Sequence, residues 1–296
     1  MTKDDICAQL TAAGLDPNAI SGLIDAAIAE DLAGGVDVTT MATVPAEQRS
    51  QLDLVARAPG VVAGIPIAAL VFENVAASAG SPVDASQDRS DGDAVVAGDV
   101  LLSIRGRTRD LLTAERTALN LLCHLSGVAT ATAKWAVALS GSQTRVRDTR
   151  KTTPLLRSLE KYAVRCGGGV NHRMALSDAA LVKDNHVVAA GGVAAAFEAV
   201  RSQFPGIPVE VEVDSLDQLD EVVAAGADLV LLDNFTADQM TEAVRRVGGR
   251  VLLEASGGLT LSDAPAVAAT GVDYVAVGAL THSAPVLDIG ADLESI

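Results

Sequence analysis

Between Gly141 and Asn185 the sequence gathers cations within an otherwise acidic chain. This window contains nine Lys or Arg residues and four acids, a charge of +5, whereas the whole chain carries −16, so the remainder carries −21. Arginine and lysine side chains that converge in a pocket bind carboxylates and phosphates through charge-assisted hydrogen bonds. The window therefore predicts a binding site for a small anion.

Carboxylates are concentrated in the segment VEVEVDS (209–215). Glu210, Glu212 and Asp214 occupy alternate positions, so a strand would project all three to one side. Carboxylates in an apolar strand need cations or a metal ion beside them, because an unpaired buried charge is strongly destabilising. Asp233 ends the next apolar run of this kind. Acids beside a phosphate site bind sugar hydroxyls or Mg²⁺, so we expect Glu212 and Asp233 to form an acidic side of the pocket.

Two glycine-containing turns, SGG (256–258) and VGA (277–279), follow the last two apolar runs. Glycine lets backbone N–H groups approach phosphate oxygens, and the start of a following helix favours an anion. In α/β barrels the last two loops of this type often hold a phosphate. The residues alone thus describe a pocket for a sugar phosphate and a carboxylate-bearing co-substrate.

The elements that position these groups follow from the apolar pattern after Gly141. Strand candidates alternate with amphipathic helix candidates, as in a parallel sheet or an α/β barrel. The strand candidates are residues 144–149, 180–186, 209–215, 229–235, 251–257 and 274–280. The chemistry of such folds lies at the carboxyl ends of the strands. Six units fall short of the usual eight, so we predict an incomplete barrel.

The first part of the chain has a different pattern. We expect two short helices within residues 4–32, with Asp16 or Asn18 capping the second, and a long, largely apolar helix over residues 109–139. Between them, β-like runs at 50–66 and 93–106 flank a helix candidate at 67–80. This order predicts an N-terminal α/β domain followed by the barrel.

Composition excludes several classes of protein. No uncharged apolar run of membrane-spanning length occurs, and the first residues lack the pattern of a signal peptide. The three widely spaced cysteines are expected to be free thiols in a reducing cytoplasm. Cys166 is interpreted as a small buried thiol, and His124 and His282 as structural residues. The overall acidity disfavours a nucleic-acid partner.

The segment DTRKTTPLLRSLEKYAVRCGGGVNHR (148–173), followed by LSDAALVKDNH (176–186), closely resembles the quinolinate phosphoribosyltransferase family of type II phosphoribosyltransferases. Other matching segments occur in the family's order along nearly the whole chain. They include AEDLAGGVDVTT (29–40), ARAPGVVAGI (56–65), AERTALNLLCHLSGVAT (114–130), EVEVDSLDQ (210–218), LLDNF (231–235), EASGGLTL (254–261) and VDYVAVGALTHSAPVLDIGADL (272–293).

The resemblance implies an α/β fold of two domains. An N-terminal α/β sandwich (1–125), onto which residues 282–296 pack back, would precede an incomplete, seven-stranded α/β barrel (126–281). The apolar pattern locates six of those strands and leaves one unlocated. The resemblance also implies a homodimer or larger homo-oligomer in which the N-terminal domain of one chain covers the barrel mouth of another.

The resemblance further implies a glycosyltransferase of NAD biosynthesis that joins quinolinate to phosphoribosyl pyrophosphate, with Mg²⁺ as cofactor, and releases pyrophosphate and CO₂. It assigns quinolinate to Arg57 from a neighbouring subunit, Arg116, Thr149, Arg150, Lys151, His172, Arg173 and Lys183. It assigns the ribose and Mg²⁺ to Glu212 and Asp233, and the 5′-phosphate to Ser256, Gly257, Gly258, Val277, Gly278 and Ala279. The implied catalytic residues are Lys151, Glu212 and Asp233.

Three alternatives compete with this interpretation. A related phosphoribosyltransferase-like protein of molybdenum transport shares much of the barrel motif but typically lacks the KDNH ending (183–186). Lys183 at a strand end could form a Schiff base as in barrel aldolases, although the acid-rich third strand disfavours this. A sensor of sugar phosphates would retain the phosphate site without turnover.

Within the cationic window, Arg157, Lys161 and Arg165 are expected on the solvent face of a structural helix.

Overall fold

The computed structural model describes all 296 residues, which divide into two compact units. The first unit contains residues Met1–Ala131, Ser158–Gly168 and Ala284–Ile296, and the second contains Thr132–Arg157 and Gly169–Ser283. The division falls inside one long helix, α5 (Thr108–Ala138), where we had placed it at residue 125. It also assigns residues 158–168, expected in the barrel, to the first unit.

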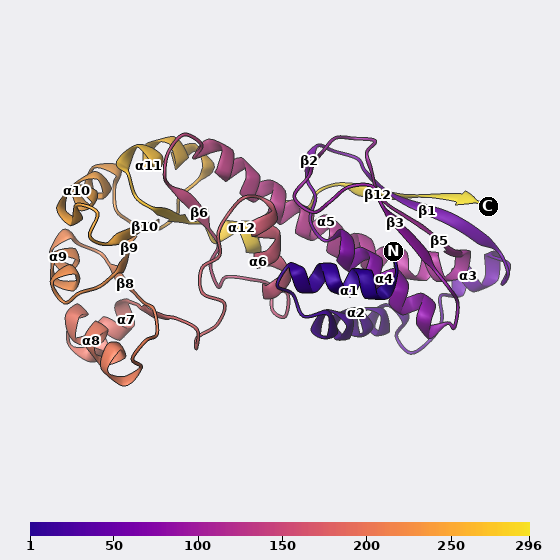
Figure 1. The fold of residues 1–296 in the computed structure, drawn as a ribbon, viewed down its shortest axis with the longest axis horizontal. Helices are drawn as coiled ribbons and strands as arrows, with labels where there is room; N and C mark the ends of the chain where they lie inside the picture. Colours follow the sequence, from indigo (N-terminus) through magenta and orange to yellow (C-terminus); the bar gives the residue numbers. More distant parts are fainter. The chain divides into compact units, whose positions relative to one another are not determined.

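The first unit is built on an antiparallel sheet with the strand order β12, β1, β5, β3. These strands are β1 (Arg49–Ala56), β3 (Asp84–Gln87), β5 (Val100–Arg107) and β12 (Ile289–Ser295). A two-stranded sheet consists of β2 (Gly60–Val61) and β4 (Ala94–Val95). Because β12 is the last strand of the chain and pairs with β1, the C-terminal segment returns to the first unit as expected (Figure 1).

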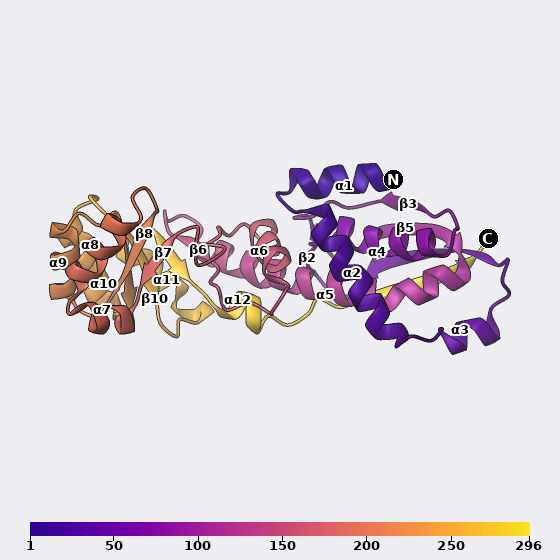
Figure 2. The same ribbon diagram turned by 90° about the horizontal axis from the view of Figure 1, so that it is seen from below.

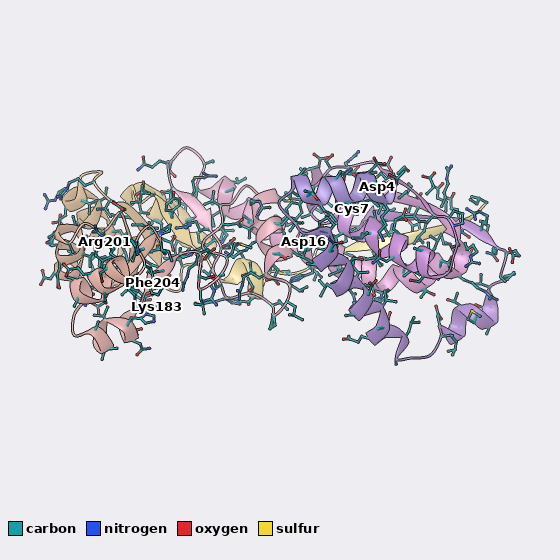
Figure 3. The ribbon with its side chains drawn as sticks, turned by 60° about the horizontal axis from the view of Figure 1, so that its bottom comes forward. Asp4, Cys7, Asp16, Lys183, Arg201 and Phe204 are labelled. Carbon is teal, nitrogen blue, oxygen red and sulfur yellow. The ribbon has the colours of Figure 1, made fainter.

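Helices form the second layer of this unit. They are α1 (Lys3–Ala12), α2 (Pro17–Leu32), α3 (Val38–Thr43), α4 (Ile65–Ser78), most of α5, and α6 (Arg157–Cys166). Helix α4 is largely buried and packs against α1, α2 and β5 (Figure 2). Asp16 caps α2 by accepting a hydrogen bond from the backbone N–H of Asn18 at 2.9 Å, so of the two predicted caps Asp16 is the one used. Figure 3 labels Asp16 in the first unit.

The second unit contains a parallel sheet of six strands in the order β6, β11, β10, β9, β8, β7. The strands are β6 (Arg145–Arg147), β7 (Ala180–Val182), β8 (Val209–Val213), β9 (Leu229–Asp233), β10 (Leu252–Ser256) and β11 (Tyr274–Ala276). Each lies within one of the six predicted runs. The seventh strand that the resemblance implied is reduced to a single parallel bridge between Arg147 and Val170, on the free side of β6.

The connections of this unit are helices α7 (Asp184–Ala190), α8 (Val193–Gln203), α9 (Leu216–Ala224), α10 (Ala237–Val247), α11 (Ala264–Thr270) and α12 (Ala279–His282), with a 3₁₀ turn at Leu261–Asp263. Helices α8, α9, α10 and α11 lie along the outer side of the curved sheet (Figure 1). Buried apolar side chains of the strands include Val211, Val230 and Leu253, and those of the helices include Val222 and Met240. This burial on both faces explains the continuous apolar runs in the sequence.

Some predicted elements have different limits. The run 180–186 was predicted as one strand, yet β7 ends at Val182 and Asp184 begins α7. Helix α6 begins at Arg157 because Leu155, which follows Pro154, has a left-handed φ of 69° that no helix accommodates. No helix of the chain has the length and apolar character needed to span a membrane.

Candidate active site

The second unit contains a cavity of about 770 Å³ at the carboxyl ends of its strands. It brings together every residue predicted to bind substrate or metal except Arg57 and Arg116, which belong to the first unit. The lining residues are Thr149, Arg150, Lys151, His172, Arg173, Leu181, Lys183, Asp184, Glu212, Leu231, Asp233, Glu254, Ser256, Gly257, Gly258, Leu259, Ala276, Val277, Gly278, Ala279 and His282. Parallel strands explain this convergence, since all of them end at one edge of the sheet.

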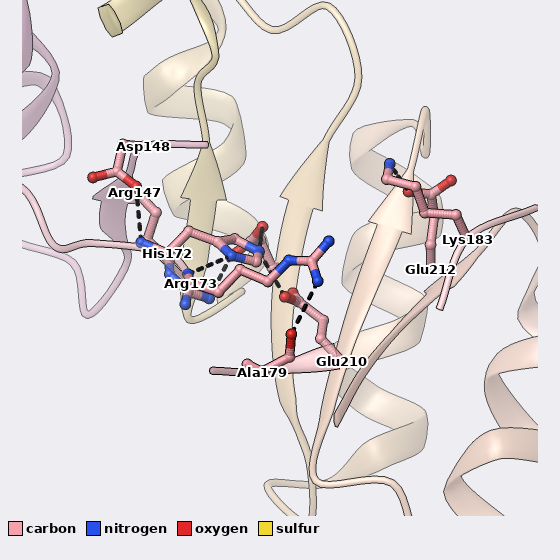
Figure 4. A network of polar contacts seen from close by, with 9 residues as sticks. Arg147, Asp148, His172, Arg173, Ala179, Lys183, Glu210 and Glu212 are labelled. Atoms are coloured by element: carbon pink, nitrogen blue, oxygen red, sulfur yellow. Dashed lines mark hydrogen bonds and ion pairs between the residues drawn. The ribbon is translucent and has the colours of Figure 1, made fainter. Parts of the chain in front are cut away.

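Arg150 and Arg173 form the cationic side of the cavity. Arg173 Nη1 donates a hydrogen bond to the carbonyl oxygen of Ala179 at 2.9 Å (Figure 4). Burial, followed by the nearby charge of Arg150, lowers the pKa of the Arg173 guanidinium. The Nε atom of Arg150 is buried without a hydrogen-bond partner. Two guanidinium groups that repel each other and retain an unpaired donor favour a ligand with more than one negative charge.

Lys151 lies on the exposed loop after β6, and neighbouring loops hold its backbone. Its N–H donates to Oγ1 of Thr149 at 3.0 Å, and its carbonyl oxygen accepts from Oγ1 of Thr281 in α12 at 2.8 Å. A Cβ added at Gly278 would lie 3.0 Å from Cδ of Lys151. Glycine at position 278 therefore leaves the space that this lysine side chain occupies.

His172 lies among the cations with both ring nitrogens engaged. Nδ1 accepts a hydrogen bond from the backbone N–H of Arg173 at 2.7 Å, and Nε2 lies 2.7 Å from Oε2 of Glu210 (Figure 4). Because Nδ1 is an acceptor, Nε2 carries the proton and donates it to Glu210. The backbone N–H of His172 donates to Asp148 at 2.9 Å. These bonds fix the loop that carries Arg173, and the predicted contact of His172 with substrate stays a prediction.

Glu254 forms a fully buried floor beneath these groups. Its Oε2 accepts a hydrogen bond from Nη1 of Arg147 at 2.6 Å, and the Arg147 guanidinium lies over the Tyr274 ring, 4.6 Å from its centre. Burial, followed by the charge of Glu210, raises the pKa of Glu254 to about 8. The floor therefore keeps a proton at neutral pH, which limits the negative charge under the anion-binding cations.

The floor also resembles a metal site in composition. One ligand atom each from His172, Glu210 and Glu254 lies within 4.8 Å of the others. The Oε1 atoms of both glutamates are buried without a hydrogen-bond partner. His172 Nε2, however, carries the proton that it donates to Glu210, so its lone pair is not available to a metal ion. A proton shared within the floor accounts for this arrangement better than a metal does.

Arg147 and Glu254 belong to the polar strand ends of the sequence, but neither was among the residues predicted to bind substrate or metal. Their signal was the presence of a charged residue at an inward position of an apolar strand, as in RVR (145–147) and VLLEAS (251–256). The same rule applied to VEVEVDS was correct for Glu210 and Glu212. It was wrong for Asp214, because β8 ends at Val213 and Asp214 is exposed beyond it.

Glu212, Asp233 and Lys183 form the acidic side of the cavity. Lys183 Nζ lies 2.9 Å from Oε2 of Glu212 (Figure 4). Burial, followed by the charge of Glu212, raises the pKa of the Asp233 carboxyl, and Lys183 opposes this shift. Two half-buried carboxylates that disfavour each other's ionisation gain from a cation between them. Their oxygen ligands suit Mg²⁺, which binds one or two carboxylates together with phosphate oxygens.

The turn after β10 contains Ser256, Gly257 and Gly258. Gly257 and Gly258 have positive φ values of 107° and 62°, a backbone region that glycine adopts without the strain that a side chain would cause. Across the cavity edge, Val277, Gly278 and Ala279 lead from β11 into α12. The two predicted phosphate turns therefore belong to adjacent strands of the sheet, β10 and β11.

Arg57 and Arg116 have partners within the first unit. Arg57 Nη2 lies 2.5 Å from Oδ1 of Asp292 in β12. Arg116 lies on α5 with a largely exposed side chain, 3.9 Å from the carboxylate of Glu115. Their assignment to quinolinate stays a prediction.

The structure also tests the predictions for one cysteine, two histidines and one lysine. Cys166 is a free, partly buried thiol whose pKa burial raises to about 12, which makes it a weak nucleophile. His124 pairs with the buried Glu160 at 2.8 Å within the first unit, as a structural residue would. His282 lines the cavity, although we had assigned it a structural role. Lys161, expected on a solvent face, is fully buried in α6.

A second cavity, of about 530 Å³, lies in the first unit near Asp91 and Tyr162. Its buried carboxylate is already satisfied: Asp91 accepts hydrogen bonds from the N–H groups of Gly64 and Ile65 and from the hydroxyl of Tyr162. These bonds anchor the start of α4 to α6. We interpret this cavity as structural, because its buried carboxylate, Asp91, is already engaged by groups of the fold.

Comparisons with known proteins agree with the geometry. Residues 128–292 match the family model of the quinolinate phosphoribosyl transferase C-terminal domain, and residues 37–126 match the model of its N-terminal domain. The chain is 53% identical over 270 residues to the nicotinate-nucleotide pyrophosphorylase [carboxylating] of Mycobacterium leprae, covering 90% of this chain and 94% of that protein. It is 40% identical to the probable enzyme of that name from Bacillus subtilis, covering 89% and 90%.

Solved structures show the same relationship. The crystal structure of NadC from Streptococcus pyogenes superposes with a TM-score of 0.90 and 41% sequence identity, covering 95% of this chain and 99% of that one. Both matched domains occur in the order expected from the sequence, and together they span most of the chain. This chain therefore belongs to the quinolinate phosphoribosyltransferase family.

Proposed function

We propose that the protein transfers the phosphoribosyl group of phosphoribosyl pyrophosphate to quinolinate with loss of CO₂, giving nicotinate mononucleotide and pyrophosphate for NAD biosynthesis. The observation that carries this proposal is the composition of the one cavity at the strand ends. It has paired guanidinium groups on one side, paired carboxylates on another and two glycine-containing turns at adjacent strands. These three features suit a dicarboxylate, a ribose and a phosphate.

The cationic residues would bind and orient the substrates. Arg150 and Arg173 suit the two carboxylates of quinolinate, because their guanidinium groups can form paired hydrogen bonds with carboxylate oxygens. Lys151 lies on the loop next to Gly278 and is suited to the leaving pyrophosphate. Holding two anionic reactants in one orientation removes much of the entropic barrier to their reaction.

The acidic residues would act on the ribose. Departure of pyrophosphate leaves a ribose with oxocarbenium character, and a preorganised carboxylate stabilises that developing positive charge. Glu212 and Asp233 are in position for this role and would also hold Mg²⁺, which supplies charge neutralisation to the pyrophosphate when bound. The pyridine nitrogen then attacks C1′, which makes the ring cationic. The positive nitrogen stabilises the electron pair left on the neighbouring ring carbon when CO₂ leaves, and this carbon then takes up a proton from water to give nicotinate mononucleotide.

We further propose a cytoplasmic homodimer or larger homo-oligomer with shared active sites, in which Arg57 of one chain and the cavity of another act together. Arg57 and Arg116 are exposed or half-exposed cations of the first unit, which supports a role toward an anion outside that unit. Mixing an Arg57→Ala chain with a chain inactivated by Lys151→Ala tests this arrangement. Shared sites predict recovery of part of the activity, whereas self-contained sites predict none.

The direct test supplies quinolinate, phosphoribosyl pyrophosphate and Mg²⁺ and measures CO₂ release and nicotinate mononucleotide. Nicotinic acid should fail as a substitute, because it lacks the carboxylate that is lost. Lys151→Ala and Arg173→Ala should each lower turnover or quinolinate affinity by more than about tenfold. Arg245→Ala is the matched control, since Arg245 is an exposed cation paired with Glu242 on α10. Wild-type kinetics in both cavity variants would contradict the assignment.

Two other functions remain distinguishable by experiment. Schiff-base chemistry at Lys183 predicts trapping by borohydride with a carbonyl substrate, but Nζ of Lys183 is engaged with Glu212 at 2.9 Å. A sugar-phosphate sensor predicts binding of phosphoribosyl pyrophosphate without CO₂ release. The half-buried guanidinium groups of Arg150 and Arg173, which suit a dicarboxylate co-substrate, favour the transferase over both.

A further inference from the structure

Asn234 directly follows β9 and has an unusual backbone conformation. Its φ of 57° is left-handed, and only two other non-glycine residues of the chain, Ala33 and Leu155, have positive φ. Asparagine tolerates this region better than most residues, because its short amide can bond to nearby groups. Asn234 is exposed and is not among the residues that line the cavity.

The side chain and backbone of Asn234 connect two parts of the candidate site. Nδ2 donates a hydrogen bond to Oδ2 of Asp233 at 2.7 Å. The backbone N–H donates to the carbonyl oxygen of Ser256 at 3.0 Å, extending the pairing of β9 with β10 by one residue. One residue thus links the carboxylate at the end of β9 with the start of the glycine turn after β10.

Gly257 shows how closely the two parts approach. A Cβ added at Gly257 would lie 2.3 Å from Oδ1 of Asn234 and 2.8 Å from its backbone nitrogen. Real side-chain atoms do not approach so closely, so glycine is required here for packing as well as for its φ of 107°. The amide of Asn234 is held between Asp233 on one side and Gly257 on the other.

This arrangement constrains the Asp233 carboxylate. Because the Asn234 amide donates a hydrogen bond to Oδ2, that oxygen is engaged and the other oxygen, Oδ1, stays available to a ligand in the cavity. Rotation of the carboxylate away from the cavity would break that bond.

We propose that Asn234 is a positioning residue for phosphoribosyl pyrophosphate, which orients Asp233 toward the ribose and sets the separation between this carboxylate and the phosphate turn Ser256–Gly258. The proposal rests on the proposed function. It concerns only the binding of phosphoribosyl pyrophosphate. Asn234 donates its side-chain hydrogen bond to Asp233, and no hydrogen bond joins it to Arg150 or Arg173, which are assigned to quinolinate.

Three substitutions separate the effect of the Asn234 amide from the effect of its left-handed backbone. Asn234→Gly keeps the left-handed backbone and removes the amide. Asn234→Asp keeps the size of the side chain but replaces the donor to Asp233 with an acceptor. Asn234→Ala removes the amide and also strains the backbone, since alanine disfavours positive φ. Trp135 fluorescence, which reports on the second unit, confirms that each variant is folded.

The measurement is calorimetric binding of phosphoribosyl pyrophosphate in Mg²⁺, together with steady-state KM values for both substrates. Loss of one hydrogen bond to a charged acceptor predicts about fivefold to tenfold weaker phosphoribosyl pyrophosphate binding in Asn234→Gly, and a larger loss in Asn234→Asp. The KM for quinolinate should change by less than about twofold. This split distinguishes a positioning role from a general loss of structure.

Each other outcome has a clear meaning. If the wild-type chain binds phosphoribosyl pyrophosphate and Asn234→Gly binds it equally well, the inference is wrong and the proposed function stands. If both KM values rise together, Asn234 is merely structural and the inference is again wrong. If the wild-type chain neither binds phosphoribosyl pyrophosphate nor releases CO₂, the proposed function itself fails.

Discussion

The buried carboxyl of Glu254 predicts an unusual dependence of stability on pH. An ordinary glutamate titrates near 4.5, whereas burial and the charge of Glu210 raise the pKa of Glu254 to about 8. Between these values the folded chain holds a proton that the unfolded chain has released. Stability therefore falls as the pH rises from about 4.5 to 8, because only the folded state still holds the proton in this range. It levels off above about 8, because the carboxyl is then ionised in both states.

The magnitude follows from the linkage relation. Each pH unit within the window contributes about 1.4 kcal/mol for one proton, so wild type should lose on the order of 4 kcal/mol between pH 5 and 8 through this group. Glu254→Gln removes the titration but keeps the shape and the oxygen that accepts from Arg147. We expect the variant to lose that much less stability than wild type over the same range.

The assay is urea denaturation followed by the fluorescence of Trp135, the single tryptophan, which is buried and lies in the same unit as Glu254. Glu242→Gln is the control, because Glu242 is exposed and its Arg245 and Arg246 partners lower its pKa to about 2, outside the window. Parallel stability curves for wild type and Glu254→Gln between pH 5 and 8 would refute the assignment of a proton to the floor.

Three further predictions concern the metal, a close approach and the first unit. Removal of Mg²⁺ with EDTA should abolish phosphoribosyl pyrophosphate binding measured by calorimetry and leave quinolinate binding intact; equal loss of both would contradict a metal at Glu212 and Asp233. Gly278→Ala should displace Lys151, whose Cδ would lie 3.0 Å from the new Cβ, and lower kcat/KM about threefold to tenfold, whereas Gly22→Ala, with open space around it, should not. Tyr162→Phe should destabilise the first unit by about 1–3 kcal/mol in calorimetric unfolding, because Asp91 loses a donor; an unchanged transition would show that this bond contributes nothing.

Local pattern predicted the second unit well. The six apolar runs contain the six strands because strands buried on both faces need continuous apolar sequence, and that requirement is visible one segment at a time. The glycine turns and the polar strand ends could be placed at one edge for the same reason. The predicted limit of β7 was wrong, because the chain begins α7 at Asp184 within the run 180–186.

The cationic window shows where local pattern fails. Arg150, Lys161 and Arg173 look alike in sequence, yet Arg150 and Arg173 line the cavity while Lys161 is buried in α6, which groups with the first unit. Burial of a charge depends on which distant segments surround it, and no neighbour in sequence specifies those segments. The resemblance did assign Arg150 and Arg173 to the substrate, and Lys161 was expected on a structural helix, but the burial of Lys161 was not foreseen.

The sequence by itself determined the family, the alternation of strands and helices, and the set of residues at the strand ends. Only the tertiary structure decided that Arg147, His172, Glu210 and Glu254 meet in one buried floor, and that Asn234 joins Asp233 to Gly257. The physical reason is the strand order β6, β11, β10, β9, β8, β7, which places residues far apart in the chain next to each other. That order depends on hydrogen bonding between strands that are far apart in the sequence. The pairing of these strands fixes the distances between the groups, and those distances decide how each group influences the protonation and orientation of the others.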